Sequence, residues 1–309
     1  MCSKSMELIK FDLKKKYSLP PLVAALGHFD GLHLAHQQLI AKTIGLAKSE
    51  DASSAVITFD PHPDYVLKKR QPVGYLTPLT DKAEALKTMG IDYLIVVPFT
   101  IEISRLASDD FETAVLDKFN IRKIVIGFDY RYGFQGRGNA ETLKRKYSVF
   151  VLEAITYRNE KMGSNAVRQM LMTGHMEAVR EVLGKYYQIT GKVVSGRRVG
   201  RTYGIRTANV DIPADYQPLK IGVYAVIVTV CAVRYRGVAN YGMKPTFKPT
   251  GAAKLEVHII DFSEMIYNEE ITVEFIRYLR EERPFPDVAA LAAQIRADIE
   301  IVEKMKVDL

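Results

Sequence analysis

The 309-residue sequence predicts an α/β domain built on a parallel sheet, followed by a β domain that ends in a helix. Two observations indicate the first domain: apolar runs alternate with helical patterns from residue 22 to about residue 152, and the runs are apolar on both faces, which is typical of parallel strands covered by helices. From residue 187 onward, short strands separated by turn residues replace this alternation. We expect the boundary near Lys185, which gives domains 1–185 and 186–309.

Each expected element of the first domain follows from its apolar pattern. The expected strands are the apolar runs 22–26, 54–59, 93–98, 123–127 and 148–152. The expected helices carry apolar residues at helical spacing and span 37–48, 81–89, 108–119, 139–146, 165–172 and 176–183. Ser108 and Asn139 are suited to cap two of these helices, because their side chains can accept a hydrogen bond from a free backbone N–H group.

The second domain is predicted from segments rich in β-branched and aromatic residues. Its expected strands include 188–194, 223–230, 235–239, 254–260 and 271–278. Turn signals such as 248–251 separate the strands, and an amphipathic helix at 287–304 closes the chain. The second domain is therefore expected to be all-β apart from this helix.

The composition is that of a globular protein, with 48% hydrophobic and 26% charged residues. No apolar run approaches the ~20 residues of a membrane span, and the N-terminus lacks the apolar core of a signal peptide. The two cysteines, Cys2 and Cys231, suggest no disulfide framework. We expect a cytoplasmic protein with no membrane partner, which is a monomer or a weak homo-oligomer.

The net charge of +7 raises the alternative of nucleic-acid binding. The densest basic runs, 14–16, 68–70 and 144–146, are accompanied by no zinc-finger spacing and no aromatic RNA-binding signature. We therefore expect small phosphorylated ligands, and no nucleic acid, as the anionic partners. Binding through the lysine runs would require retention on polyanions with a steep salt dependence.

Four of the six histidines fall between positions 28 and 62, in the segments 27–36 and 59–63. The first segment joins a predicted strand to a predicted helix, where free backbone N–H groups and the positive end of the helix favour a phosphate. His33 and His36 can both face that phosphate from one turn, and Gly31 allows close approach of the backbone. A zinc site is the other interpretation of the histidines, but no nearby cysteine and no helical HExxH motif supports it.

Motifs in a fixed order run through both domains. Those of the first domain are Gly27-His-Phe-Asp-Gly31, the pair His33 and His36, Phe59-Asp-Pro-His-Pro63 and Gly127-Phe-Asp-Tyr-Arg-Tyr-Gly133. Those of the second are Gly200-Arg-Thr-Tyr-Gly204, Thr207-Ala-Asn209, Gly222-Val-Tyr224, Lys244-Pro-Thr246, Leu255-Glu-Val-His258 and Leu279-Arg280. By these motifs the chain resembles the prokaryotic bifunctional riboflavin kinase/FAD synthetase family almost from end to end. The resemblance implies a Rossmann-like parallel-sheet nucleotidyltransferase domain and a riboflavin kinase-like six-stranded β-barrel with a terminal helix.

For the first domain, the resemblance implies attack of FMN on the α-phosphate of ATP, which forms FAD and releases pyrophosphate. His33 and His36 would then be the catalytic residues. The residues implied in ATP and phosphate binding are Gly27, His28, Phe29, Asp30, Gly31, Ser164 and Arg168. The residues implied in flavin binding are His62, Asp129 and Arg131.

For the second domain, the resemblance implies transfer of the ATP γ-phosphate to the 5′-hydroxyl group of riboflavin, with Glu256 as the base. The alternative for Glu256 is a carboxylate that faces solvent from a strand. Thr207 and Asn209 would bind Mg²⁺, a hard cation that prefers oxygen ligands, and Arg280 would bind flavin. The residues implied in ATP binding here are Gly200, Arg201, Thr202 and Gly204.

The chain departs from the family's motifs at four positions. Ala35 stands where the His-x-Gly-His signature has glycine, and Arg206 replaces the proline before Thr-Ala-Asn. Gly163 and Asn165 replace a serine and a threonine of the Ser-Ser-Thr-x-x-Arg segment. Two alternatives to the bifunctional enzyme therefore stay open: an enzyme that retains one of the two activities, and a catalytically weak flavin-binding regulator.

Overall fold

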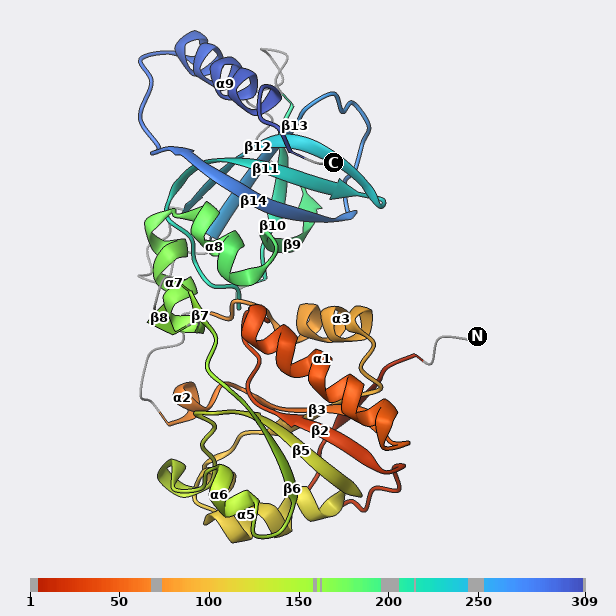
Figure 1. Ribbon diagram of the computed structural model, residues 1–309. Coiled ribbons are helices and arrows are strands. Elements are labelled where there is room, and N and C mark those ends of the chain that lie inside the picture. The colour runs from red at the N-terminus through yellow and green to blue at the C-terminus, as the bar shows by residue number, and fades with distance from the viewer. Residues whose placement is uncertain are drawn as a thin grey trace. The chain divides into compact units, whose positions relative to one another are not determined.

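The computed structural model describes residues 5–67, 74–157, 160–161, 163–195, 206–213, 215–243 and 253–307. The chain forms two compact units (Figure 1). One consists of Met1–Pro72 and Thr77–Gly163, and the other of Val73–Leu76 and Ser164–Leu309. The domain boundary expected near Lys185 stays a prediction.

The first unit is built on a parallel sheet of six strands in the order β1-β4-β3-β2-β5-β6, which confirms the predicted fold class. The strands are β1 (Glu7–Lys10), β2 (Leu22–Leu26), β3 (Ser53–Asp60), β4 (Tyr93–Pro98), β5 (Ile121–Gly127) and β6 (Ser148–Leu152). The sequence did not predict β1, a four-residue edge strand in which only Ile9 is buried. A short antiparallel pair, β7 (Thr156–Tyr157) and β8 (Glu160–Lys161), follows the sheet.

Helices cover both faces of this sheet (Figure 1). They are α1 (Leu34–Ser49), α2 (Pro63–Val66), α3 (Leu79–Met89), α4 (Ile101–Ser104), α5 (Ser108–Ala114), α6 (Ala140–Leu143) and the 3₁₀ turns Leu116–Lys118 and Phe134–Gly136. The helix expected at 108–119 is wrong in length, since α5 ends at Ala114. Ala107 occupies the N-cap position expected for Ser108, whereas Asn139 caps α6 in a capping box with Thr142.

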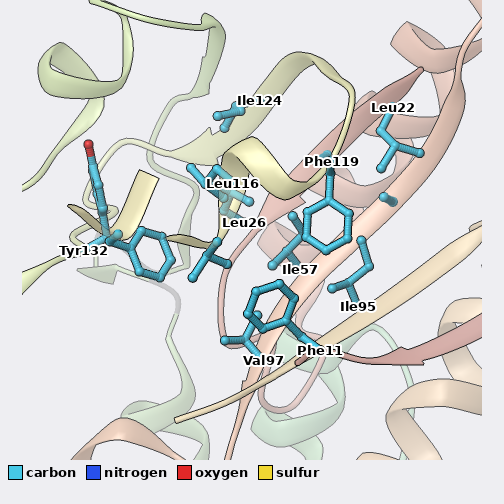
Figure 2. Close-up of a cluster of buried hydrophobic side chains, with 14 of the residues drawn as sticks. Phe11, Leu22, Leu26, Ile57, Ile95, Val97, Leu116, Phe119, Ile124 and Tyr132 are labelled. Atoms are coloured by element: carbon cyan, nitrogen blue, oxygen red, sulfur yellow. The ribbon is translucent and has the colours of Figure 1, made fainter. Parts of the chain in front are cut away.

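The alternation of side chains along β2 separates two apolar cores. Leu22, Ala24 and Leu26 face the core under α5 and α6, and Val23 and Ala25 face the core under α1 and α3. Figure 2 shows the first of these cores, in which aliphatic side chains of the strands lie among aromatic rings. Because both faces of β2 are buried, the end of the strand and the turn that follows are held on both sides.

The second unit is a closed antiparallel barrel of six strands in the order β10-β13-β12-β11-β14-β9, which confirms the predicted barrel. The strands are β9 (Tyr187–Val194), β10 (Ala208–Asp211), β11 (Gly222–Val230), β12 (Val233–Met243), β13 (Ala253–Ile259) and β14 (Glu270–Arg280). Two helices, α7 (Ser164–Thr173) and α8 (Met176–Leu183), precede it, and α8 packs against β9 and β14. Inside the barrel, the rings of Tyr224 and Phe275 meet edge to face at 5.2 Å.

The terminal helix α9 (Val288–Glu303) packs on the outer surface of the barrel (Figure 1). Val302 joins an apolar cluster with Val223 and Ala225 of β11. An ion pair also links this helix to the barrel. Arg280 of β14 donates from Nε and Nη2 to Oδ2 of Asp298 at 3.1 and 2.8 Å. In the part of the chain that the structure describes, no helix is long and apolar enough to cross a bilayer.

Replacement of Asp298 by alanine is expected to lower the free energy of unfolding of the second unit by about 3 kcal/mol, because Arg280 loses its counter-charge at a buried helix face. Urea unfolding followed by circular dichroism measures this change. Glu300→Ala, which removes an exposed carboxylate from the same helix, is the matched control and should change the value by less than about 0.5 kcal/mol. Equal losses in both variants would contradict a specific role of the ion pair.

Candidate active sites

The strand order of the first unit reverses beside β2. The chain runs from β2 to β3 and β4 on one side, while β5 and β6 lie on the other. Parallel sheets bind their ligands beyond the carboxyl ends of the strands at such a reversal. The segments 27–33 and 128–133 follow β2 and β5 there, and His62 follows the end of β3. The first candidate site is therefore at this edge of the sheet.

The turn from β2 into α1 has an unusual backbone. Phe29, Gly31 and Leu32 have positive φ angles of 53°, 85° and 43°. For a non-glycine residue such a conformation costs about 1–2 kcal/mol. The side chains of Phe29 and Leu32 are 1% and 2% exposed, so their burial in the core offsets that cost. The buried carboxylate of Asp30 also accepts a hydrogen bond from the N–H group of Thr77 at 3.0 Å. Core packing and this hydrogen bond hold the turn in one shape.

The four clustered histidines form two ring pairs. The rings of His28 and His62 meet edge to face at 4.0 Å, which joins the turn after β2 to the end of β3. The rings of His33 and His36 stack at 3.7 Å with an interplanar angle of 18°. The structure thus brings the two histidine segments together at the carboxyl edge of the sheet.

The stacked pair lies at the amino end of α1. His33 is the N-cap residue, with φ −64° and ψ 168°, and the first turn of the helix contains no acidic residue. No carboxylate of that turn therefore offsets the positive end of the helix, which favours an anion. Ala35, where the family has glycine, is the second residue of this helix.

The surroundings of His36 keep its ring neutral. Burial lowers its pKa well below the ordinary value of 6.5, and the neighbouring His33 and Lys82 lower it further. A neutral imidazole has one donor and one acceptor nitrogen. Among the described residues, Nδ1 of His36 is buried and has no hydrogen-bond partner. That atom is therefore available for a hydrogen bond with a ligand.

A backbone hydrogen bond determines which ring nitrogen of neutral His62 carries the proton. Its Nδ1 accepts a hydrogen bond from the N–H group of Asp64 at 3.1 Å, which caps α2. Neutral His62 therefore carries its proton on Nε2, the atom with which it can donate to another group. Its expected contact with flavin stays a prediction.

The loop after β5 presents Asp129 and Arg131 at the surface. The rings of Tyr130 and Tyr132 in the same loop stack at 5.9 Å. The buried Tyr132 donates its hydroxyl hydrogen to Glu112, and burial together with this hydrogen bond raises the pKa of Tyr132 above its ordinary value. The loop is thus anchored through Tyr132, while Asp129 and Arg131 are exposed.

Ser164 and Arg168, which were expected to bind phosphate, belong to the second compact unit. Ser164 is the first residue of α7, followed by Asn165, and Arg168 lies one turn later. Arg168 is buried, and its Nη2 donates to the carbonyl oxygen of Gly74 at 3.5 Å. The expected action of both residues on ATP stays a prediction.

The second candidate site lies on the outer face of the barrel. Glu256 of β13 pairs in register with Asn209 of β10 on one side and with Asn240 of β12 on the other. Its neighbours Leu255 and Val257 are fully buried, so the alternation along the strand directs Glu256 outward. Three polar side chains therefore form one row across three adjacent strands.

Further groups extend this row. Lys254 forms an ion pair with Glu256 at 2.6 Å, and Nδ2 of Asn240 donates to Glu282 at 2.7 Å. The amide oxygen of Asn240 is buried and has no hydrogen-bond partner among the described residues. Sequence reasoning missed Asn240, because its place beside Glu256 follows from strand register and not from a motif.

Arg206 precedes the start of β10. Its Nη1 donates to the carbonyl oxygen of Ser263 at 2.9 Å, and its own carbonyl oxygen lies 2.7 Å from Nδ1 of His258. The positive charge of Arg206 is therefore held at the Ser263 carbonyl group. Thr207, the next residue, is exposed, and Asn209 is half-buried.

The remaining expected site residues of the second domain are Arg280 and the segment from Gly200 to Gly204. Arg280 is paired with Asp298, and its expected contact with flavin stays a prediction. The expected ATP ligands Gly200, Arg201, Thr202 and Gly204 lie outside the described residues, as does the motif Lys244-Pro-Thr246.

Comparison with known proteins divides the chain in two. The family model for FAD synthetase matches residues 15–168, and the model for riboflavin kinase matches residues 183–306. The bifunctional riboflavin kinase/FMN adenylyltransferase of Listeria monocytogenes is 38% identical over 89% of this chain and 90% of its own length. The protein of the same description from Haemophilus influenzae is 32% identical over 96% of this chain and 97% of its own length.

The structure of the whole chain also has a close counterpart. A crystal structure from Streptococcus pneumoniae, described as a macrolide-efflux protein, matches with a TM-score of 0.89 and 28% identity. The match covers 97% of this chain and 99% of that one. Together with the two family models and the curated relatives, these likenesses give the assignment: the chain belongs to the bifunctional riboflavin kinase/FMN adenylyltransferase family.

Proposed function

We propose that this chain phosphorylates riboflavin to FMN in its second domain and adenylylates FMN to FAD in its first, with ATP as the co-substrate of both reactions. The observation that carries the proposal is that each family model falls mainly on one unit, and each unit has a matching polar cluster. The first unit has the stacked His33 and His36 at the amino end of α1, and the second has Glu256 beside Asn209.

In the adenylylation, a phosphate oxygen of FMN forms a bond to the α-phosphorus of ATP, and the bond from that phosphorus to the bridging oxygen of pyrophosphate breaks. Negative charge that develops on the phosphoryl oxygens needs fixed donors. The N–H groups at the start of α1 and the imidazole groups of His33 and His36 would supply them. Since His36 is neutral, it offers a hydrogen bond and does not repel the cation that accompanies ATP.

In the phosphorylation, the 5′-oxygen of riboflavin forms a bond to the γ-phosphorus of ATP, and ADP leaves. Glu256 would accept the proton of the 5′-hydroxyl group. Lys254 and the register with Asn209 and Asn240 hold this carboxylate in its row on the outer face of β13. A strand face that only met solvent would not bury the amide oxygen of Asn240 beside Glu256 without a partner among the described residues.

Magnesium fits the donor atoms of the second site. Thr207 and Asn209 offer hydroxyl and amide oxygens, which suit a hard cation that keeps several waters. They would hold Mg²⁺, which when bound neutralises charge on the ATP phosphates. The guanidinium group of Arg206 donates a hydrogen bond to the Ser263 carbonyl oxygen, so its positive charge is engaged by that oxygen.

The remaining expectations stay predictions. They are a cytoplasmic location, a monomer or weak homo-oligomer, and the absence of a nucleic-acid partner. The competing function is that of a flavin-binding regulator with little catalysis, which the changes at Ala35, Gly163, Asn165 and Arg206 would favour if they disable both sites.

The flavin products separate these functions. After incubation of the purified chain with MgATP, chromatography should show FMN and FAD from riboflavin, and FAD from FMN. If FAD forms in the incubation with FMN but no product forms from riboflavin, the defect lies at the kinase site. If riboflavin yields FMN and neither incubation yields FAD, the defect lies at the adenylylation site. The absence of any product from either flavin would contradict the enzymatic function and favour the regulator.

Glu256→Gln is expected to lower riboflavin phosphorylation by about 100-fold or more, because the amide cannot accept the proton of the 5′-hydroxyl group. FMN adenylylation by the same preparation should not change. Steady-state rates of both reactions measure this. Glu270→Gln, which changes an exposed carboxylate on β14, is the control and should affect neither reaction. Loss of both activities in Glu256→Gln would show that the two sites are not separate.

His36→Ala is expected to lower FAD formation by about 100-fold, because a fixed hydrogen-bond group is removed from the phosphate site. Riboflavin phosphorylation should keep its rate, and chromatography of the flavin products measures both reactions. His175→Ala, which removes an exposed imidazole, is the matched control. An unchanged rate of FAD formation in His36→Ala would remove this histidine from the site.

A further inference from the structure

Lys82 is a charged side chain in the interior of the first unit. It lies on α3 and is 2% exposed. Lysine is almost never buried to this extent without a specific partner. The partners of Lys82 lie on the two segments that carry the clustered histidines, so the residue belongs to the architecture of that site.

The first partner is the backbone of the turn after β2. Nζ of Lys82 donates to the carbonyl oxygen of His28 at 2.7 Å, and Oγ1 of Thr58 donates to the same oxygen at 3.0 Å. These two bonds use both lone pairs of the carbonyl oxygen. Because the peptide group is planar and trans, the N–H group of Phe29 points away from both donors. Lys82 therefore helps to set the direction of an N–H group in the turn that leads into α1.

The other partners are charged. Asp30, in the turn, and Asp60, at the end of β3, attract the ammonium group of Lys82. Burial lowers the pKa of Lys82 to about 8, although these carboxylates oppose the fall. The positive charge of the same ammonium group lowers the pKa of His36 of α1. Lys82 is thus charged at neutral pH and loses its charge as the pH rises through about 8.

We propose that Lys82 is a positioning residue for adenylylation: together with Thr58, its ammonium group holds the carbonyl group of His28 and so fixes the turn that receives the phosphates of ATP. The proposal rests on the proposed function of the first domain. Removal of the ammonium group would weaken the hold on the carbonyl group of His28, beside the strained Phe29, and would leave Asp30 and Asp60 without the positive charge that both attract.

The test compares Lys82→Met with the wild-type full-length chain. FAD formation from FMN and MgATP should lose roughly 10- to 100-fold in kcat/KM for ATP at neutral pH, because the phosphate-binding groups are no longer aligned. Riboflavin phosphorylation by the same preparation should keep its rate. Lys87→Met, which removes an exposed lysine from the same helix, is the matched control and should leave both reactions unchanged. Wild-type values of kcat/KM in Lys82→Met would overturn the proposal.

The pH profile separates positioning from a structural role. Wild-type FAD formation should fall as the pH rises through about 8, where Lys82 loses its proton, and riboflavin phosphorylation should show no such fall. The residual FAD formation of Lys82→Met should lack this alkaline fall. A variant that is slower but keeps the wild-type profile would show that Lys82 only supports the fold, which would overturn the proposal.

A second variant covers the case in which Lys82→Met does not fold. Thr58→Val removes the other donor to the His28 carbonyl oxygen and leaves all charges in place. Like Lys82→Met, it should lower kcat/KM for ATP in FAD formation. The pH profile of the wild-type chain can be measured whether or not Lys82→Met folds. If Thr58→Val is unchanged and the wild-type profile is flat near pH 8, the proposal is wrong. A wild-type chain that forms no FAD would instead overturn the proposed function of the first domain.

Discussion

The turn between β2 and α1 is the feature on which the first site depends. Phe29 and Leu32 hold positive φ angles there, and their buried side chains stabilise a backbone that would be unfavourable in isolation. The same turn carries His28 and ends at the stacked pair of His33 and His36. A small movement of this backbone would therefore displace these three histidines together. Such a turn is prepared before the ligand arrives, so binding orders little of it.

The second site depends on strand register instead of a strained turn. Glu256 faces outward between Asn209 and Asn240 because β13 pairs with β10 and β12 in one register. A slip of one residue would turn Glu256 toward the interior and expose both Leu255 and Val257. The apolar interior of the barrel thus fixes the position of a polar row on its outer surface. A strained turn positions the first site and strand register positions the second. This difference agrees with two separate reactions on one chain.

The sequence predicted the parts of the structure that depend on local pattern. Short apolar runs predicted the strands from β2 to β6, and the change of pattern predicted the barrel. It missed β1, whose single buried residue leaves no periodic signal. It also missed Lys82 and Asn240, because helix packing and strand register bring them to the sites from distant parts of the sequence. The motif residues were found through resemblance, and their contacts with ligands are still predictions.

The central claim is that one chain carries out two phosphorus transfers at two sites, and labelled ATP tests it most directly. The full-length chain is incubated with riboflavin and Mg²⁺, once with ATP labelled at the γ-phosphorus and once with ATP labelled at the α-phosphorus. The account predicts γ-label in FMN and in FAD, and α-label in FAD but not in FMN. FAD that carries α-label without γ-label, or flavin that carries no label from either form of ATP, would contradict it.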